Sequence, residues 1–156
     1  SPANAPQDRS MFSFKYLPLL FVMVVTAVGC GSQVTAPGLD SPSAKRLERI
    51  GDAYLRATVQ LNKPPASDKE LLPFLKEQGK PDELSVSPVD KEKYVIVWGV
   101  ELRMLKATGT AMPVVAYEKK GADGKRHVLR GRTDVYLLTE GELKNSVLPA
   151  SHAFPF

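Results

Sequence analysis

Few side chains in this chain of 156 residues could do chemistry. It has a single cysteine, Cys30, and two histidines, His127 and His152. One thiol excludes an intrachain disulfide, so the folded part must be held together by its core. Zinc is normally bound by three or four clustered nitrogen, sulfur or oxygen ligands, and neither histidine has a recognised ligand spacing. We therefore expect no metal site and no cofactor.

The sequence contains no catalytic motif that we recognise, so we propose no catalytic residue. The chain has no Gly-x-Ser-x-Gly turn, no Gly-rich phosphate loop and no helical His-Glu-x-x-His. Glu140 and Glu142 could act as an acid and a base, but helix capping explains this pair better. His127, on a predicted strand, is interpreted as a pairing or solvent-facing residue. We expect that the protein is not an enzyme. The alternative is a hydrolase with an unrecognised site, which a pocket lined by Glu101, Arg103 and His127 would favour.

A basic cluster surrounds an Asp123-Gly124 turn near the C-terminal end. Its six cations are Lys119, Lys120, Lys125, Arg126, Arg130 and Arg132. They could bind an anionic partner such as a lipid headgroup, a glycan or an acidic protein. An ordinary solvated hairpin, whose charges keep edge strands from pairing, is the preferred interpretation.

The region around Cys30 has the pattern of an export signal. An apolar run from Tyr16 to Gly29 follows Lys15, and at about 1.5 Å per residue a helix of this run would be too short to cross a bilayer. The run ends in Ala27-Val28-Gly29-Cys30, which resembles the lipobox of bacterial lipoproteins. The resemblance implies signal cleavage after Gly29 and lipid attachment to Cys30. Several acyl chains then make the anchor stable, because one chain alone binds only marginally.

These patterns divide the chain into five parts. Residues 1–10 are interpreted as an upstream or non-native extension and residues 11–29 as the signal peptide. Residues 30–40 form a flexible tether that is rich in small residues, Gly and Pro. A domain at residues 41–148 and a tail at residues 149–156 follow. From Cys30 onward the chain has 127 residues with 19 Lys and Arg against 16 Asp and Glu, enough for one domain and too weakly basic to indicate nucleic acid.

Hydrophobic spacing and capping residues predict the helices. A long helix begins at Ser41, an N-cap followed by proline, carries an apolar face through Leu61, and ends before Pro64. A capping box at Ser67-Asp68-Lys69-Glu70 opens a shorter helix that ends at Gly79. A second capping box, at Thr139-Glu140-Gly141-Glu142, opens a short C-terminal helix.

Strand patterns occupy the region between these helices. Residues 94–98 and 113–117 are rich in β-branched and aromatic side chains, and residues 127–129 and 135–138 supply returning strands. Tyr94, Ile96 and Trp98 alternate to one face, where packing against the long helix is favoured over a ligand-stacking role. The predicted fold is therefore α+β, with a long N-terminal helix and a short helix packed on an antiparallel β-meander, and a short C-terminal helix.

Three segments carry a resemblance to a known family: LERIGDAYLRATVQLNKPPASDKELLPFL, VVAYEKKGADGKRHVL and VYLLTEGEL. Together they resemble the soluble part of planctomycete pilin-like proteins and, more distantly, the pseudopilins of type II secretion. The resemblance implies a fold and transfers no catalytic residue. The chain departs from pilins in having a lipobox and a tether in place of the Gly-Phe-Thr-Leu-x-Glu cleavage motif, which argues against assembly into a pilus.

The sequence thus predicts a lipoprotein with a signal peptide, held by palmitate-type lipid on the plasma or outer membrane of a bacterium. Its expected role in the cell envelope is non-catalytic binding or structure. The membrane, through Cys30, is the expected partner, together with envelope or secretion-system proteins and without nucleic acid. The sequence does not indicate an oligomeric state.

Overall fold

The computed structural model describes residues 40–155, which belong to one compact unit. The fold is α+β with a four-stranded antiparallel sheet, as predicted. In chain order the elements are α1 (Pro42–Gln60), α2 (Asp68–Gln78), α3 (Pro81–Leu84), β1 (Val95–Ile96), a 3-10 turn (Gly109–Ala111), β2 (Val114–Tyr117), β3 (Lys125–Arg130), β4 (Asp134–Thr139) and α4 (Glu140–Lys144).

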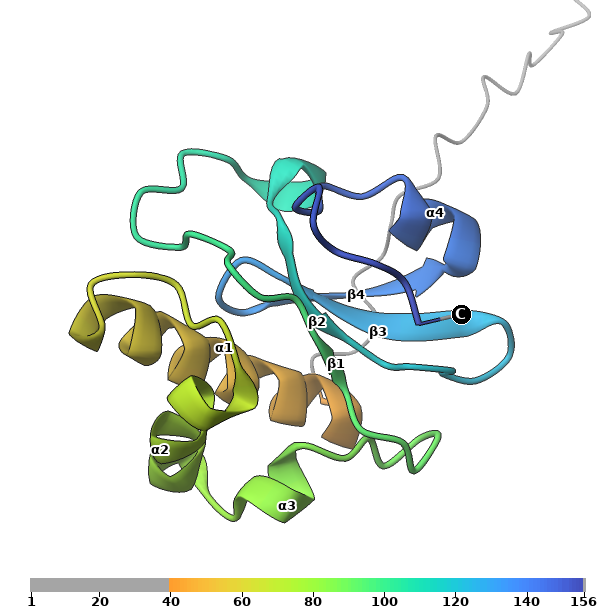
Figure 1. Cartoon of the computed structure of the whole chain (residues 1–156). Helices are drawn as coiled ribbons and strands as arrows, with labels where there is room; N and C mark the ends of the chain where they lie inside the picture. Colours follow the sequence, from red (N-terminus) through yellow and green to blue (C-terminus); the bar gives the residue numbers. More distant parts are fainter. Residues whose placement is uncertain (1–39, 156) are drawn as a thin grey trace, which may run out of the picture. The chain divides into compact units, whose positions relative to one another are not determined.

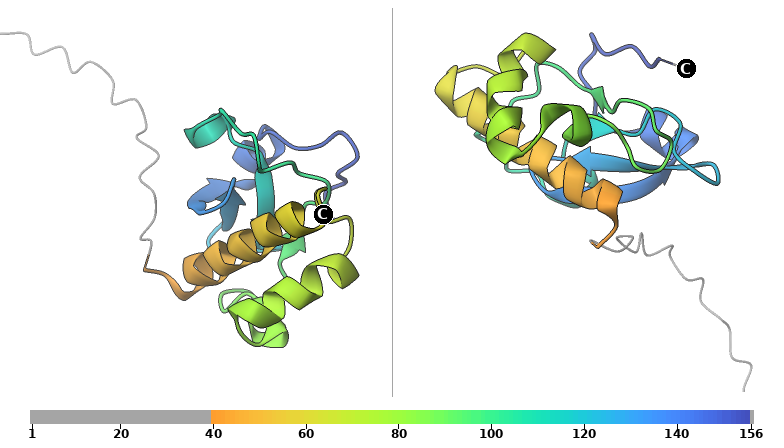
Figure 2. Two further views of the ribbon diagram at one scale, coloured as in Figure 1. Left: turned by 90° about the vertical axis from the view of Figure 1, so that its left-hand side faces the viewer. Right: turned by 90° about the horizontal axis from the view of Figure 1, so that it is seen from below.

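Helix α1 lies across one face of the sheet, and α2 packs beside α1 (Figures 1 and 2). Ser41 is the N-cap of α1, since its Oγ accepts a hydrogen bond from the Ala44 amide at 3.0 Å. Gly51 of α1 lies against the β3–β4 turn and Leu129. A Cβ added at Gly51 would lie 1.9 Å from the carbonyl oxygen of Arg132 in the β3–β4 turn.

The capping box predicted at the start of α2 is only half formed, and this part of the prediction is wrong. The Ser67 side chain makes no capping hydrogen bond. Glu70 does reach back, but its carboxylate accepts from the Ala66 amide at 2.7 Å and from Lys63 Nζ at 2.8 Å. The carboxylate therefore satisfies a donor one residue before the expected one. The helix runs through Pro73 to Gln78.

The sheet is a meander in the order β1-β2-β3-β4. The Asp123-Gly124 hairpin is confirmed: both residues have positive φ, of 51° and 72°, and Ala122 and Lys125 exchange two backbone hydrogen bonds of 2.9 Å. This is the geometry of a type I′ turn, which suits the twist of antiparallel strands. Strands β3 and β4 are longer than the runs predicted for them.

Strand β1 is shorter than predicted, because the ends of its segment bond to loops. The Tyr94 amide donates to Ser85 O at 2.9 Å and the Gly99 amide donates to Pro65 O at 3.2 Å. Between them, the Val97 amide still donates to Val115 O on β2 at 2.8 Å. An apolar run predicts that a segment is extended, but the partner that it finds depends on the rest of the fold.

The two faces of the sheet are covered differently (Figures 1 and 2). One face packs on α1 through fully buried residues of α1 and the strands, including Leu47, Tyr54 and Leu129. The other face is covered by α4 and by the C-terminal segment. Residues 149–155, predicted as a tail, pack there: His152 and Phe154 contact the ring of buried Tyr117.

Candidate functional site

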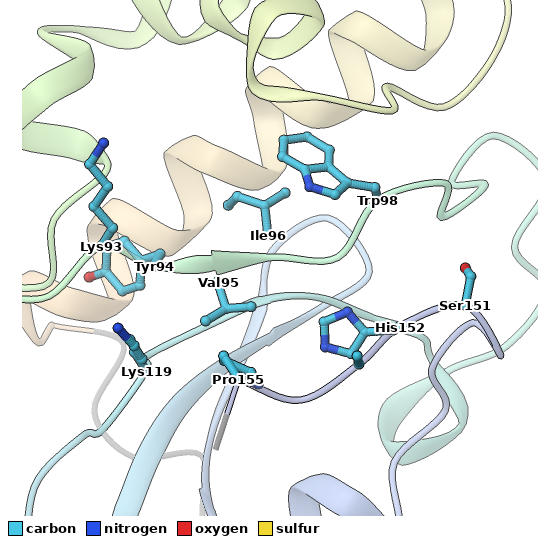
Figure 3. Close-up of a pocket in the computed structure, with 10 residues that line it drawn as sticks. Lys93, Tyr94, Val95, Ile96, Trp98, Lys119, Ser151, His152 and Pro155 are labelled. Carbon is cyan, nitrogen blue, oxygen red and sulfur yellow. The ribbon is translucent and has the colours of Figure 1, made fainter.

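The candidate site surrounds β1, which is an edge strand of the sheet. A hollow of about 490 Å³ lies between β1 and the C-terminal segment (Figure 3). Val95 points into this hollow, opposite His152 and Pro155. Its pairing partner, Tyr117, lies on the same face of the sheet, because residues directly opposite in a ladder share a face.

A second hollow, of about 270 Å³, lies on the other face of the same strand. Ile96 of β1 and Trp98 just after it line this hollow, and the α1 and α2 side chains Ile50, Leu71 and Leu75 form its apolar floor. Its lining also includes the polar residues Asp68, Ser85 and Lys93. In Figure 3, Ile96 and Trp98 point toward the helices while Val95 points away from them. Trp98 is half-buried and lines both hollows, so the prediction that it is a core residue is only partly met.

Two buried tyrosines fix the strand between the hollows. Tyr54 of α1 donates its hydroxyl hydrogen to Val97 O at 3.1 Å and accepts from the Val100 amide at 2.9 Å. The hydroxyl of Tyr94 lies 2.7 Å from Ser43 Oγ at the start of α1. Burial raises the pKa of both phenols to about 12, so both stay neutral hydrogen-bonding groups.

The C-terminal wall of the first hollow is built around His152. Its Nε2 lies 2.9 Å from the Tyr117 hydroxyl, and its ring meets the rings of Tyr117 and Phe154 edge to face. Burial lowers the pKa of His152 below its ordinary value of 6.5, so the neutral imidazole is favoured. The wall is therefore aromatic and uncharged at neutral pH.

Positive charge gathers at one end of the first hollow. Lys93 and Lys119 are among its lining residues, and no carboxylate is. The two lysines lie on opposite sides of β1: Lys93 points to the helix side, with Ile96 and Trp98, and Lys119 lies on the side of Val95 (Figure 3). Lys119 lies 3.7 Å from Glu92, which also binds Lys120 at 2.5 Å. Lys93 is exposed and makes no ion pair within residues 40–155. An anionic group entering the hollow would find at least one cation that is not already neutralised.

A buried polar network lies between the sheet and the start of α1, and its centre is Glu118. Its carboxylate is fully buried and accepts from the hydroxyls of Ser43 and Ser87. It also accepts from the His127 amide at 2.8 Å and from His127 Nδ1 at 2.9 Å. Burial raises the pKa of this carboxyl, but the hydrogen bonds from His127 and the two serines outweigh burial, and the pKa lies below 4.5.

His127 is a pairing residue, one of the two roles predicted for it. Besides Glu118, it contacts Ser41, whose Oγ lies 3.2 Å from His127 Nε2. Ser41, His127 and Glu118 thus form a chain of polar contacts in the order serine, histidine, carboxylate, as in hydrolytic triads. The pocket that would favour a hydrolase is not formed, however. Glu101 and Arg103 bind one another, and Arg103 also donates to Asn62, just beyond the last turn of α1, whereas His127 lies at the first turn.

Comparisons with protein families, with curated proteins and with solved structures find no match for this chain. The resemblance to pilin-like proteins therefore stays a prediction.

The six basic residues of the predicted patch are placed in two different settings. Arg126 and Arg130 are buried. Arg126 donates to Lys119 O and lies 3.3 Å from Glu140, and Arg130 donates to Thr110 O. These two guanidinium groups hold loops and α4 on the sheet.

The other four cations of the patch are at least partly exposed. Lys119 and Lys120 share Glu92, and Arg132 binds Asp52 of α1 at 2.7 Å. Lys125 is exposed and makes no ion pair within the described range. The structure therefore leaves Lys125 as the patch residue most available to an anion. A role for the patch in binding stays a prediction.

Several predictions concern residues outside the described range. Cys30, the cleavage position at Gly29, the signal peptide and most of the tether lie before residue 40. Within residues 40–155, no helix has the length and apolar character needed to span a membrane. The same residues contain no group of three His, Cys, Asp or Glu side chains placed to hold a metal ion.

Sequence reasoning missed both the Glu118 network and the two hollows. No motif singles out Glu118, which stands next to the basic hairpin in the sequence. The available signal was its position: it follows the fully apolar run Val114–Tyr117 and so continues a buried strand. A single charge at the end of such a run indicates either a strand end or a buried group with partners.

Proposed function

We propose that this protein is a lipid-anchored component of a bacterial cell envelope, whose domain has a non-catalytic binding role. The observation that carries the binding role is the pair of hollows on the two faces of edge strand β1. A concave, mostly apolar site with a few polar groups is the usual form of a binding site. The ligand is envelope material, and envelope or secretion proteins are the expected partners.

The anchor rests on the sequence around Cys30. Lipid on Cys30 and a tether of residues 31–40 would hold the domain within at most about 35 Å of the bilayer, given about 3.5 Å for each extended residue. This distance keeps the domain close to partners on the same membrane. It also suits a protein that captures or organises neighbouring components.

The finer fold assignment belongs to the same proposal. A long helix that crosses an antiparallel meander, with a shorter helix beside it and a short helix after the last strand, is the arrangement expected for a pilin-like soluble domain. The contacts of α1 with β2, β3 and β4, and of α4 with β3 and β4, support this assignment. The proposal transfers the architecture alone.

The interactions of the Glu118 network support a structural role for it. Both carboxylate oxygens accept hydrogen bonds from the protein, and Ser41 Oγ already accepts the capping bond from Ala44. Ser41 is also not among the residues that line the hollow of about 460 Å³ beside His127. A hydrolase is nonetheless the second candidate, because His127 contacts both Ser41 and Glu118, the order of groups in a hydrolytic triad. Labelling by a fluorophosphonate that Ser41→Ala abolishes and Ser43→Ala preserves would favour the hydrolase.

Site-specific crosslinking in the living bacterium tests the binding role. A photoreactive lysine analogue is placed at Lys93, in the first hollow, or at Lys125, at the hairpin turn. Both positions are exposed and unpaired within the described residues, so the comparison is matched. We expect a discrete crosslinked species from position 93 and a much weaker one from position 125.

The distribution of crosslinks has two informative alternatives. A product from position 125 alone would place the partner at the basic hairpin and overturn the assignment to β1. The absence of any product at position 93 in correctly localised protein would overturn the binding role of the hollows.

A further inference from the structure

The two edges of the sheet differ in how much of their backbone is already bonded. At the β1 edge, loop carbonyls accept from the amides of Tyr94 and Gly99, so only a short stretch between them is open. The other edge is β4, and all six of its residues pair with β3 in unbroken register. Strand β4 has no lysine, no proline and no bulge, the features that usually keep an edge strand from pairing with another chain. The fold therefore protects one edge and leaves the other open.

Alternation along β3 and β4 identifies the backbone groups that point out of the sheet at this edge. His127 of β3 directs its backbone toward β2, since its carbonyl accepts from the Glu118 amide at 3.0 Å. His127 pairs with Leu137, so Leu137 directs its own N–H and C=O outward, and Val135 does the same two positions earlier. The next outward amide, of Thr139, already donates to a carboxylate of α4 at 2.8 Å. Within residues 40–155, the outward groups of Val135 and Leu137 have no hydrogen-bond partner.

We propose that two copies of this chain pair through β4, antiparallel and about a two-fold axis at Tyr136. The two four-stranded sheets then form one sheet of eight strands. Val135 of each copy lies opposite Leu137 of the other, and each such pair exchanges two backbone hydrogen bonds. This inference goes beyond the proposed function and depends neither on lipid at Cys30 nor on the hollows beside β1.

A second copy fits this edge because its free backbone groups are arranged symmetrically. The two free residues stand one on each side of Tyr136, so an axis there satisfies the outward groups of both copies. An axis at Leu137 would place Val135 opposite Thr139, whose amide is already bonded. An axis at Val135 would place Leu137 opposite Thr133, which belongs to the β3–β4 turn. The register centred on Tyr136 therefore leaves none of these groups unbonded.

The side chains near the axis also complement a second copy. Tyr136 and Leu137 are half-buried and lie on opposite faces of the sheet, so pairing would cover apolar surface on both faces. The same register brings the turn that carries exposed Arg132 next to the start of the other copy's α4, where Glu140 and Glu142 lie. Opposite charges therefore meet at each end of the interface, as an isologous contact requires.

A cysteine at the proposed axis tests the pairing directly. The full chain with Cys30→Ser has no other thiol. In this register Tyr136 faces its own copy in a non-hydrogen-bonded pair, with Cα atoms about 4.5 Å apart, which a disulfide can join. On mild oxidation in detergent, Tyr136→Cys should therefore give a dimer that a reducing agent separates. The matched control is Asp134→Cys, half-buried on the same face, which would lie roughly 14 Å from its copy and should stay unlinked.

A charge on the edge tests the pairing without a crosslink. Leu137→Lys adds to β4 the residue type that most often keeps natural edge strands apart. We expect it to weaken dimerisation at least about tenfold in sedimentation velocity of the full chain in detergent. Leu72→Lys, the same change at an exposed residue of α2, should leave the dimer unchanged. Circular dichroism confirms that both variants are folded.

Three results would overturn the proposal. The first is wild-type protein that stays monomeric at every concentration tested, with no disulfide in Tyr136→Cys. The second is equal linking of Asp134→Cys and Tyr136→Cys, or full dimerisation of Leu137→Lys, either of which would place the contact elsewhere. The third is a photoreactive residue at position 137 that links a different protein and never a second copy, which would assign the edge to that partner.

Discussion

Glu118 is a charged residue with no exposed surface, and its neighbours explain why it is tolerated there. An unpaired buried carboxylate is strongly unfavourable, whereas one that accepts several hydrogen bonds can remain ionised. Its donors come from α1, from the loop before β1 and from β3, through Ser43, Ser87 and His127. One side chain thereby joins three separate parts of the chain.

Glu118→Gln should destabilise the protein by about 2 to 3 kcal/mol, because the amide cannot accept on both of its terminal atoms and leaves buried donors unpaired. Urea denaturation followed by Trp98 fluorescence measures the loss. The control is Glu77→Gln, an exposed residue paired with Arg56 at 3.1 Å, which should change stability by no more than about 0.5 kcal/mol. Equal losses from both variants would contradict a structural role for the Glu118 network.

The contribution of Glu118 should also depend on pH in a defined direction. Its pKa in the folded protein lies below the ordinary value of 4.5. The folded state therefore holds the ionised form more strongly, and this stabilisation is present above about pH 4.5 and is lost as pH falls through the folded pKa. The stability gap between wild type and Glu118→Gln should be constant near neutral pH and narrow below about pH 4.5. A gap that widens on acidification would show that the pKa is raised.

Among the elements, α1 sets the position of the sheet and of the site. Its first turn carries Ser43 of the Glu118 network, its middle carries Ile50 of the second hollow, and Tyr54 holds the end of β1. The close approach that allows these contacts depends on Gly51. A helix usually loses about 1 kcal/mol for glycine relative to alanine, so the glycine is retained here against helix propensity.

Gly51→Ala should destabilise the protein by about 2 kcal/mol or more, because its Cβ would lie 1.9 Å from Arg132 O, a backbone atom that cannot move alone. The matched control is Gly141→Ala in α4, where an added Cβ meets nothing within 4 Å. That change should be neutral or stabilise by up to about 1 kcal/mol. Thermal unfolding followed by circular dichroism distinguishes a loss of stability in Gly51→Ala from no change or a gain in Gly141→Ala. A stabilising Gly51→Ala would mean that α1 does not lie this close to the β3–β4 turn.

For the molecule as a whole, the determining feature is the proposed anchor at Cys30. Metabolic labelling with a palmitate analogue should mark the wild-type protein and leave Cys30→Ala unlabelled, because Cys30 is the only thiol in the chain and the predicted modification site. Equal labelling of both proteins would reject the anchor.

Local patterns predicted the parts of the fold whose interactions are local. The Thr139–Glu142 capping box, the Asp123-Gly124 turn and the α+β class depend on residues a few positions apart, and all three are present. The Ser67 capping box failed at the same scale, because Glu70 found a competing donor at Ala66. The strand predicted at residues 94–98 is shortened for a different reason, since Tyr94 bonds to Ser85 and Gly99, just after its end, bonds to Pro65.

The sequence alone determined the lipobox-like pattern at Cys30, the helix and turn signals, and the class of fold, because each is written in the spacing of neighbouring residues. The tertiary structure alone decided the burial of Glu118, the pairing of His127 and the two hollows around β1. Glu118 meets Ser43 across 75 positions of the chain, and Trp98 shares its hollow with α2. Such contacts depend on how the elements pack, and no local pattern records that packing.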